Sequence, residues 1–286
     1  MVSTETTTKS APTAPAWDDA LLRNPHAVAD KRTRVRRMFA AIAPSYDLNN
    51  RLHSLWMDQH WRGKAVKLAE LKAADVVVDV ACGTGDLAVH FENMLDWLCA
   101  VEGSNRRPSV IGVDFTFEML PLARRKTRFW EHAHRPPPGV SNLPGSYRDA
   151  VHWINGDAQA LPLADASADV VSIAFGIRNV ADPAAALREF SRVLRPGGRV
   201  IVLEFSLPTN PLLRGLYNVY FRQILPRTAT LVSGDKTGAY KYLPESVNTF
   251  IGREQMMGMM REAGFVQVEQ FPMTFGVCVC YRGVKP

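Results

Sequence analysis

Residues 78–86 read VDVACGTGD, an apolar strand that ends abruptly in a glycine-rich turn. The run VVVDV at 76–80 is typical of a strand in the buried centre of a parallel sheet. Gly83 and Gly85 let the backbone turn tightly and approach a ligand where a Cβ would clash. The apolar residues within 87–91 begin a helix whose N-terminus points at the same spot. This stretch predicts a strand–turn–helix unit that holds a ligand, although such turns also occur without one.

The composition is that of an ordinary globular protein. The chain has 286 residues, of which 47% are hydrophobic and 22% charged, enough for one α/β domain with additions or for two small domains. It contains no apolar run of roughly 18 residues, the length of a membrane span. The cysteines lack the spacing of metal ligands, which indicates free thiols, no metal site and a reducing, cytoplasmic location; they are Cys82, Cys99, Cys278 and Cys280.

Residues 1–30 are expected to form a disordered tail, because the segment is rich in Thr, Ser, Ala and Pro and lacks the apolar region of a signal peptide. The basic cluster KRTRVRR at 31–37 follows, within a chain of net charge +6. It is interpreted either as a solvated helix face or as a surface attracted to anionic lipid headgroups. Nucleic acid is not expected as a partner, because no aromatic stacking platform or recognition helix accompanies the cluster.

Strands and helices alternate from residue 75 onward, after a segment at 31–72 that is expected to form a helical cap. This alternation predicts a doubly wound, mostly parallel α/β sheet. The last two strands are joined by too few residues for a crossover, so they are expected to form an antiparallel hairpin. The predicted strands are 76–81, 109–114, 151–157, 169–176 and 199–205, followed by the runs FVQVEQF and FGVCVCYRG.

Two segments are expected to be insertions into this pattern. Residues 92–108 lengthen the first crossover, and residues 131–150 form a loop rich in Pro, Gly and Ser. His132 and His134 lie in that loop, but two histidines without a third ligand do not make a metal site. The prediction for 131–150 is therefore a solvent-exposed loop.

Carboxylates at the ends of three predicted strands indicate which ligand the turn holds. Asp79 would repel a pyrophosphate but attract an ammonium group. Asp114 is placed to accept hydrogen bonds from both hydroxyls of a ribose, and Asp157 with Ala158 from an adenine amino group. Because the carboxyl ends of parallel strands line one crevice, these residues describe an adenosine that bears an amino acid, S-adenosylmethionine. The expected cofactor residues are Asp79, Gly83, Thr84, Gly85, Asp114, Asp157 and Ala158.

Two long stretches resemble the ubiquinone/menaquinone biosynthesis C-methyltransferases, the UbiE/MenG family of class I methyltransferases that depend on S-adenosylmethionine. The first is MFAAIAPSYDLNNRLHSLWMDQHWR at 38–62, close to that family's Y-D-x-x-N signature. The second is FGIRNVADPAAALREFSRVLRPGGRVIVLEFS at 175–206, nearly the family's other signature throughout. YKYLPESVNTF at 240–250 and the end of the chain also fit, so the resemblance covers residues 38–286.

The resemblance implies a Rossmann-like, seven-stranded sheet within a methyltransferase domain at 31–286. It also implies transfer of a methyl group to a ring carbon of a polyprenylated quinol. Demethylmenaquinol is the favoured acceptor, and 2-methoxy-6-polyprenyl-1,4-benzoquinol is the alternative. Asp58 stands where many members have His, and Arg195 where Lys is usual, but neither is among the expected cofactor residues.

The residues expected to serve the acceptor come from the end of the fourth strand and from the helical cap. Arg178 is assigned to stabilising the quinol oxyanion, since a guanidinium stays protonated, and Asn179 stands beside it. Tyr46 and Asp47 come from the cap, with Asp47, or a water that it holds, as the base. Structural roles stay open for Arg178, as a tie between the strand end and the cap, and for Tyr46, in helix packing.

The amphipathic stretch 211–227 is interpreted as a core-facing helix or, together with the 31–37 cluster, as a transient contact with the inner face of the membrane. A homodimer is left open, as are two other functions. One is a catalytically idle cofactor-binding subunit of a quinone-synthesis assembly. The other is a nicotinamide oxidoreductase, because the turn also fits the dinucleotide pattern G-x-G-x-x-A; Asp79 and the C-terminal hairpin argue against it.

Overall fold

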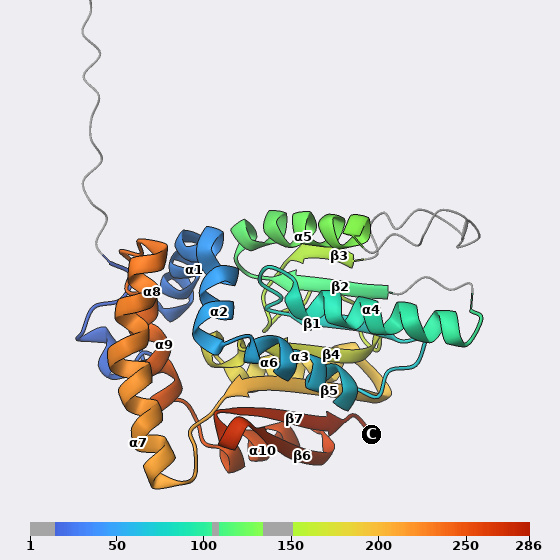
Figure 1. The fold of residues 1–286 in the computed structure, drawn as a ribbon. Helices are drawn as coiled ribbons and strands as arrows, with labels where there is room; N and C mark the ends of the chain where they lie inside the picture. The colour runs from blue at the N-terminus through green and yellow to red at the C-terminus, as the bar shows by residue number, and fades with distance from the viewer. Residues whose placement is uncertain (1–14, 105–108, 134–150) are drawn as a thin grey trace, which may run out of the picture.

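Seven strands form one mixed sheet, as predicted from the sequence (Figure 1). The computed structural model describes residues 15–104, 109–133 and 151–286. The strand order is β3-β2-β1-β4-β5-β7-β6, with parallel pairs from β3 to β5 and antiparallel pairs on both sides of β7. The strands are β1 (Val76–Val80), β2 (Ser109–Asp114), β3 (Val151–Asn155), β4 (Ala168–Ala174), β5 (Leu194–Phe205), β6 (Val266–Met273) and β7 (Cys278–Val284).

The order of the strands reverses between β1 and β4. β2 and β3 lie on one side of β1, and β4 and β5 lie on the other. Both edges of β1 are paired, so that Val78 is in register with Ile111 of β2 and with Val171 of β4. The crossovers on the two sides diverge at this point and leave a crevice at the carboxyl ends of β1 and β4. The topology therefore locates the ligand site where the glycine-rich turn predicted it.

Helices cover both faces of the sheet (Figure 1). α3 and α4 bury Trp61 and Phe91 on one face, and α6 and α10 bury Phe190 and Met260 on the other. The elements around the sheet are α3 (Met57–Leu68), α4 (Asp86–Val101), α5 (Leu120–Ala133), α6 (Pro183–Val193) and α10 (Arg253–Glu262), with short 3-10 turns η3 (Phe117–Met119), η4 (Ile177–Asn179) and η6 (Thr274–Gly276).

Two predicted boundaries are wrong. The first concerns the predicted insertion at 92–108: residues 92–101 are not a separate segment but continue α4 and lengthen the crossover as helix, because Leu95 and Cys99 prolong its buried apolar stripe at helical spacing. α3 is not part of a cap but covers the sheet, because Trp61 and Ala65 form a similar stripe, 3% and 0% exposed. In both places the apolar periodicity decides which surface the helix covers.

A cap of helices stands over the carboxyl edge of the sheet, at the left of Figure 1. α1 (Lys31–Ile42), η2 (Ala43–Ser45) and α2 (Tyr46–Ser54) are its predicted N-terminal part. Its second part follows β5 and was not predicted as cap. These elements are α7 (Pro211–Val219), the π-helical segment η5 (Tyr220–Ile224), α8 (Leu225–Ser233) and α9 (Ala239–Asn248). The two parts share a hydrophobic core that includes Met38, Phe221 and Tyr242.

The prediction of a disordered tail is wrong for residues 15–30, which are ordered against the cap. Trp17 is 2% exposed and stacks on Tyr242, with ring centroids 4.5 Å apart. A 3-10 turn, η1 (Leu21–Arg23), follows it. Ala16 and Leu22 are buried in the same core, and the N–H of Trp17 donates to the carbonyl of Thr237 at 3.1 Å, so apolar contact and a backbone hydrogen bond together order this segment. The remainder of the predicted tail, 1–14, lies outside the described residues, as does most of the predicted loop, 134–150.

Trp17→Ala is expected to lower the free energy of unfolding by about 3–5 kcal/mol, because it empties a buried aromatic site in the cap. Trp97→Ala is the matched control, since Trp97 is 60% exposed on α4. The control should change the same quantity by less than about 0.5 kcal/mol. Urea denaturation followed by circular dichroism measures both, and equal effects would show that residues 15–30 add no packing energy.

Candidate cofactor and substrate site

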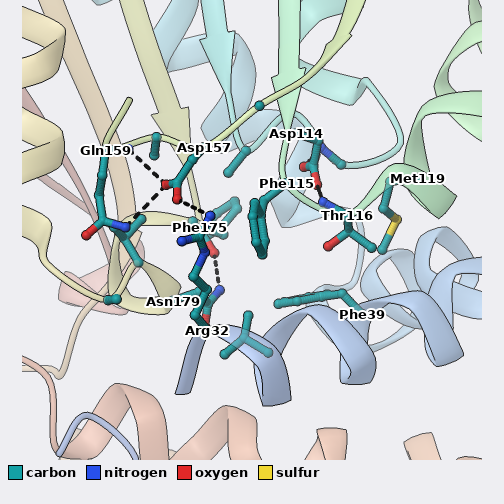
Figure 2. A pocket seen from close by; sticks show the side chains of 18 of the residues that line it. Arg32, Phe39, Asp114, Phe115, Thr116, Met119, Asp157, Gln159, Phe175 and Asn179 are labelled. Carbon is teal, nitrogen blue, oxygen red and sulfur yellow. Dashed lines mark hydrogen bonds and ion pairs between the residues drawn. The ribbon is translucent and has the colours of Figure 1, made fainter. Parts of the chain in front are cut away.

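The crevice at the carboxyl edge of the sheet holds a cavity of about 110 Å³ (Figure 2). Its walls come from the turns after β1, β2, β3 and β4 and from α1. Three residues of α1 also line it and were not predicted to do so: Arg32, Val35 and Phe39. Their spacing of i, i+3 and i+7 is typical of one helix face, and this spacing is the signal that would have indicated them. The predicted site residues that line this cavity are Tyr46, Gly83, Asp114, Asp157, Ala158 and Asn179.

The turn after β1 has a backbone conformation that few residue types adopt. Gly83 and Gly85 have φ angles of +55° and +86°, and Ala81 has a φ of +52° although it carries a Cβ. A Cβ on Gly176, in the turn after β4, would lie 2.6 Å from the Cβ of Ala81. Left-handed conformations at non-glycine residues persist only where the surrounding structure holds them, and they gather at functional sites. The two turns thus form a tightly constrained floor for the cavity.

Asp114 holds this turn and also lines the cavity. Its Oδ2 accepts the N–H of Gly83 and its Oδ1 accepts the N–H of Thr116, both at 2.7 Å. Burial raises the pKa of Asp114 to about 6, although these hydrogen bonds oppose the shift. An ionised carboxylate can accept about four hydrogen bonds. Asp114 can therefore fix the turn and still accept hydrogen bonds from the hydroxyls of a ligand.

Asp157 lies across the cavity from Asp114 (Figure 2). Its Oδ1 accepts the N–H of Gln159 at 3.0 Å, and its Oδ2 lies 2.7 Å from Nη2 of Arg32. The Arg32 guanidinium in turn lies 4.5 Å from the centroid of the Phe115 ring. The carboxylate predicted to meet an adenine amino group is thus also an anchor for α1.

Three of the predicted cofactor residues do not line the cavity. Asp79 is 1% exposed; its Oδ1 accepts the hydroxyl of Ser172 at 2.8 Å, while its Oδ2 has no hydrogen-bond partner among the described residues. Burial raises the pKa of Asp79 to about 7. Thr84 is 3% exposed and donates its hydroxyl to α2. A Cβ on Gly85 would lie 2.6 Å from the ring of Trp153. These residues shape the turn from behind.

A second cavity, of about 320 Å³, lies beneath the cap. Phe39, Tyr46 and Phe175 line both cavities, so the two cavities meet at these side chains. The second cavity was not predicted, because its walls come from elements far apart in the sequence. Most of its lining is aromatic or aliphatic and includes Met38, Ile42, Trp61, Phe205, Tyr217, Phe221, Leu225, Tyr240 and Tyr242.

Arg178 lines the second cavity, but most of its guanidinium is already paired. It is 4% exposed, and its Nη1 donates to the carboxylate of Glu204 and, at 2.8 Å, to the carbonyl of Phe175. Its Nε donates to the hydroxyl of Ser246 at 3.4 Å. Among the described residues, Nη2 has no hydrogen-bond partner. Arg178 thus ties η4 to β5 and α9, and one of its nitrogens is left for a ligand.

Asn179 and Asp47 do not lie where groups that act on an acceptor in the second cavity are expected. Asn179 lines the first cavity only, and its Oδ1 accepts the hydroxyl of Tyr242 at 2.9 Å. Asp47 lines neither cavity. Its Oδ1 accepts the Thr84 hydroxyl at 2.6 Å, and its Oδ2 lies 2.7 Å from Nζ of Lys126. This geometry does not support Asp47 as the base.

Comparison with known sequences shows the family of the chain. Residues 27–285 match the model of the ubiE/COQ5 methyltransferase family. A demethylmenaquinone methyltransferase from Thermus thermophilus is 42% identical over 251 residues, which cover 87% of this chain and 100% of that protein. Another from Deinococcus radiodurans is 40% identical and covers 90% and 94%. A ubiquinone/menaquinone biosynthesis C-methyltransferase from a Geobacter species is 39% identical and covers 91% and 100%.

Comparison with solved structures agrees on the fold. An S-adenosylmethionine-dependent methyltransferase from Thermotoga maritima aligns with a TM-score of 0.55 over 88% of this chain and 100% of its own length. At 20% sequence identity this similarity supports the shared fold alone. The sheet order, the turn after β1 and the family match over nearly the whole chain lead to the same conclusion. The chain belongs to the ubiE/COQ5 methyltransferase family.

Proposed function

We propose that this protein methylates a ring carbon of a polyprenylated quinol, and that the acceptor is demethylmenaquinol, which becomes menaquinol. The cofactor of the family is S-adenosylmethionine, which supplies the methyl group when bound. The observation that carries the proposal is the aromatic second cavity, which meets the cofactor cavity at a wall of shared side chains. The relatives named demethylmenaquinone methyltransferase support the choice of a naphthoquinol.

The first cavity suits an adenosyl cofactor in shape and in charge. Gly83 lines it without a side chain and so permits close approach of a ligand to the backbone, while Gly176 lets the turn after β4 pack against Ala81. We assign Asp114 to the ribose hydroxyls, and Asp157 with Ala158 to the adenine. The turn at Gly83 would hold the methionyl end. Asp79, Thr84 and Gly85 would act on the cofactor through the turn that they shape.

The second cavity suits a flat, hydrophobic ring. The rings of Phe175 and Phe205 lie 4.6 Å apart between centroids, and Trp61 lies about as close to both, 6.1 Å and 6.0 Å away. A quinol ring among these side chains would be shielded from water, which strengthens each electrostatic interaction made there. Tyr46 and Phe175 would align the ring with the cofactor cavity, because both side chains belong to the shared wall.

Arg178 is the residue that we assign to the electron-rich form of the ring. Carbon methylation needs electron density on the ring, and a phenolate supplies more of it than a phenol. A phenolate oxygen next to Nη2 of Arg178 would gain a charge-assisted hydrogen bond. Glu204 neutralises part of the charge, but it also fixes the planar guanidinium in one orientation. The reduced quinol is therefore the expected substrate, and the oxidised quinone is not.

A second acceptor, 2-methoxy-6-polyprenyl-1,4-benzoquinol, is favoured by relatives whose names join ubiquinone and menaquinone biosynthesis. The test is transfer of a labelled methyl group from S-adenosylmethionine to short-chain forms of both quinols under reducing conditions, with the oxidised quinones as controls. The proposal predicts transfer to demethylmenaquinol only when it is reduced. Faster transfer to the benzoquinol would show that the benzoquinol is the acceptor. No transfer to either quinol would favour the hypothesis of a catalytically idle cofactor-binding subunit.

We also propose that α7 makes transient contact with a membrane surface. α7 has no buried residue, and its Leu212, Leu216 and Val219 are 72%, 62% and 51% exposed. The basic cluster at 31–37 contributes little to such a surface, because Lys31 is buried and two of its arginines form ion pairs. Among the helices of the described residues, none is long and apolar enough to span a bilayer. A homodimer through α7 is the alternative.

Replacing Leu212 and Leu216 together by serine is expected to reduce co-sedimentation with anionic vesicles that contain a short-chain quinol, because it removes apolar area that would enter the headgroup region. Trp97→Ser, at a site 60% exposed on α4, is the control and should sediment as the wild type does. Size-exclusion chromatography identifies the alternative: a wild-type dimer that the double substitution converts to a monomer would indicate a homodimer interface instead.

Asp114→Ala is expected to weaken S-adenosylmethionine binding by roughly 1–3 kcal/mol, because the ribose hydroxyls and the Gly83 N–H lose their acceptor. Below about pH 6 protonation removes part of the same acceptor capacity, so wild-type affinity should fall as the pH drops through the raised pKa of Asp114. The variant should lack that fall. Calorimetric titrations at several pH values measure both effects. Asp165→Ala, with a side chain 78% exposed, is the control. Unchanged affinity in Asp114→Ala would contradict the assignment.

Arg178→Lys is expected to slow methyl transfer by about 100-fold with little change in melting temperature. Lysine keeps a cation beside Glu204 but loses the planar fork that presents Nη2. Arg178→Ala is a poorer test, since it leaves Glu204 buried without a cation and should destabilise the fold by about 3–5 kcal/mol. Arg199→Lys is the control, because Arg199 is 8% exposed beside Asp75 at the other end of the sheet. Turnover of Arg178→Lys within a few-fold of wild type would show that Arg178 is structural.

A further inference from the structure

A cluster of charged side chains lies behind the turn after β1, and apart from Thr84, which shapes that turn, its members have no role in the function described above. Lys126 of α5 is at its centre: its Nζ lies 2.7 Å from Oδ2 of Asp47, 2.6 Å from Oδ1 of Asp86 and 3.0 Å from the Thr84 hydroxyl. These three acceptors match the three N–H donors of an ammonium group. The Thr84 hydroxyl in turn donates to Oδ1 of Asp47 at 2.6 Å. One cation therefore joins α2, α5 and the start of α4.

The centre of the cluster is shielded from solvent, whereas Asp47 lies at its exposed edge. The side chains of Lys126 and Asp86 are 17% and 8% exposed, and that of Asp47 is 38% exposed. Burial alone would raise the pKa of Asp86, but Arg62, Lys126 and Arg51 outweigh it and hold that pKa well below its usual range. Arg51 of α2 adds a second tie, with its Nη2 2.9 Å from both oxygens of Asp86. The two ion pairs of Asp86, with Lys126 and with Arg51, are therefore screened by salt far less than surface pairs.

Few apolar contacts hold α2 in place otherwise. Of its nine residues only Asn49 is buried, while Leu48 and Leu52 are 61% and 45% exposed. Helices with few buried apolar contacts open locally at low free-energy cost.

Other polar contacts hold the C-terminal end of α2: Nε2 of His53 lies 2.8 Å from the hydroxyl of Thr228, and the hydroxyl of Tyr220 donates to the carbonyl of His53 at 3.0 Å. Arg51 and Ser54 also donate to the carboxylate of Asp58 on α3, at 2.6 Å and 2.8 Å. These contacts all lie at residues 51–54, so the polar cluster is the constraint that acts on the first turn of α2, through Asp47.

The position of α2 matters because its first residue, Tyr46, lines both cavities. A Cβ on Gly83 would lie 4.0 Å from Cε1 of Tyr46, so the tyrosine ring stands over the cofactor turn. Asp47 follows Tyr46 in the sequence and Thr84 follows Gly83, and Asp47 and Thr84 form a hydrogen bond. The two residues held by Lys126 are therefore the direct neighbours of the two residues that face the cavities.

We propose that Lys126 is a positioning residue that latches α2 onto the cofactor turn and so holds Tyr46 between the cofactor and the acceptor. The kinetic part of this inference rests on the proposed function, whereas the structural part does not. Without the latch, which consists of Lys126, Asp47, Thr84 and Asp86, Tyr46 would leave the shared wall and the acceptor would lose its alignment. The cofactor contacts assigned to Asp114 and Asp157 do not involve α2, so cofactor affinity should change little.

Lys126→Met tests the latch, because methionine keeps an apolar stem of similar length without the charge. Hydrogen exchange of the amides in residues 46–54 should become at least about tenfold faster, which corresponds to 1.4 kcal/mol of lost local stability. The kcat/KM for the reduced quinol should fall by at least about tenfold, while the dissociation constant of S-adenosylmethionine stays within about threefold. Asp47→Asn should add little in the Lys126→Met background, since both substitutions break the same latch.

Arg192→Met is the matched control. Arg192 also bridges two carboxylates, those of Glu189 and Asp165, but it lies on α6, away from both cavities. It should change neither the exchange of α2 nor the kinetics. Unchanged exchange of α2 in Lys126→Met would overturn the latch whatever the substrate is. Faster exchange with unchanged quinol kinetics would overturn the positioning role. If the wild type methylates no quinol, the exchange result still decides the latch, and the proposed function alone fails.

Discussion

The hydrogen bond from the Gly83 N–H to Asp114 is the interaction on which the rest of the site depends. It joins the turn after β1 to the end of β2, next to the point where the strand order reverses. The N–H of Cys82 adds a parallel tie to the carbonyl of Val113 at 3.2 Å. The turn is thereby ordered before a ligand arrives, so a cofactor does not bear the entropy cost of ordering it. That rigid floor is also what Tyr46 stands over and what Lys126 binds from behind.

This arrangement lowers the stability of the fold. Asp79 and Asp114 are both buried, and burial raises their pKa values to about 7 and about 6. A carboxyl with a raised pKa in the folded state ionises more readily in the unfolded chain. Both groups therefore lower the free energy of unfolding near neutral pH, and less so at acidic pH. Ala81 and Phe175 add left-handed backbone at positions that carry a Cβ. Backbone strain and buried carboxyl groups thus occur together at the carboxyl edge of the sheet. This is expected where ligand binding, and not the stability of the core, determines which residues are present.

The two cavities differ in the polarity of the side chains that line them. Carboxylates and constrained turns supply the first cavity, and aromatic rings of the cap supply most of the second. The shared wall is thin, since only Phe39, Tyr46 and Phe175 line both. In the proposed function the cap would therefore have two roles: it would enclose a hydrophobic ring, and through α2 it would set the distance between that ring and the cofactor turn.

The sheet and its turn could be predicted from the sequence because their signals are local. The run at 76–80, the glycines after it and the short connection before β7 each act over a few residues. The second cavity could not be predicted, since Trp61 and Tyr240 meet only through the tertiary fold. Nor does a motif indicate which way a side chain faces: Asp79 points into the structure and Asp114 into the cavity.

In the proposed function, cofactor and acceptor occupy separate cavities on the two sides of Tyr46. A crystal structure with S-adenosylhomocysteine would locate the cofactor, because this ligand carries the nucleoside and the amino-acid end without the reactive methyl group. We predict that the ribose contacts Asp114, that the adenine lies beside Ala158, and that the aromatic cavity beyond Tyr46 holds no part of the ligand. A nucleoside bound among the aromatic side chains of the second cavity, or a ribose without contact to Asp114, would show that the two cavities are not divided between cofactor and acceptor in this way.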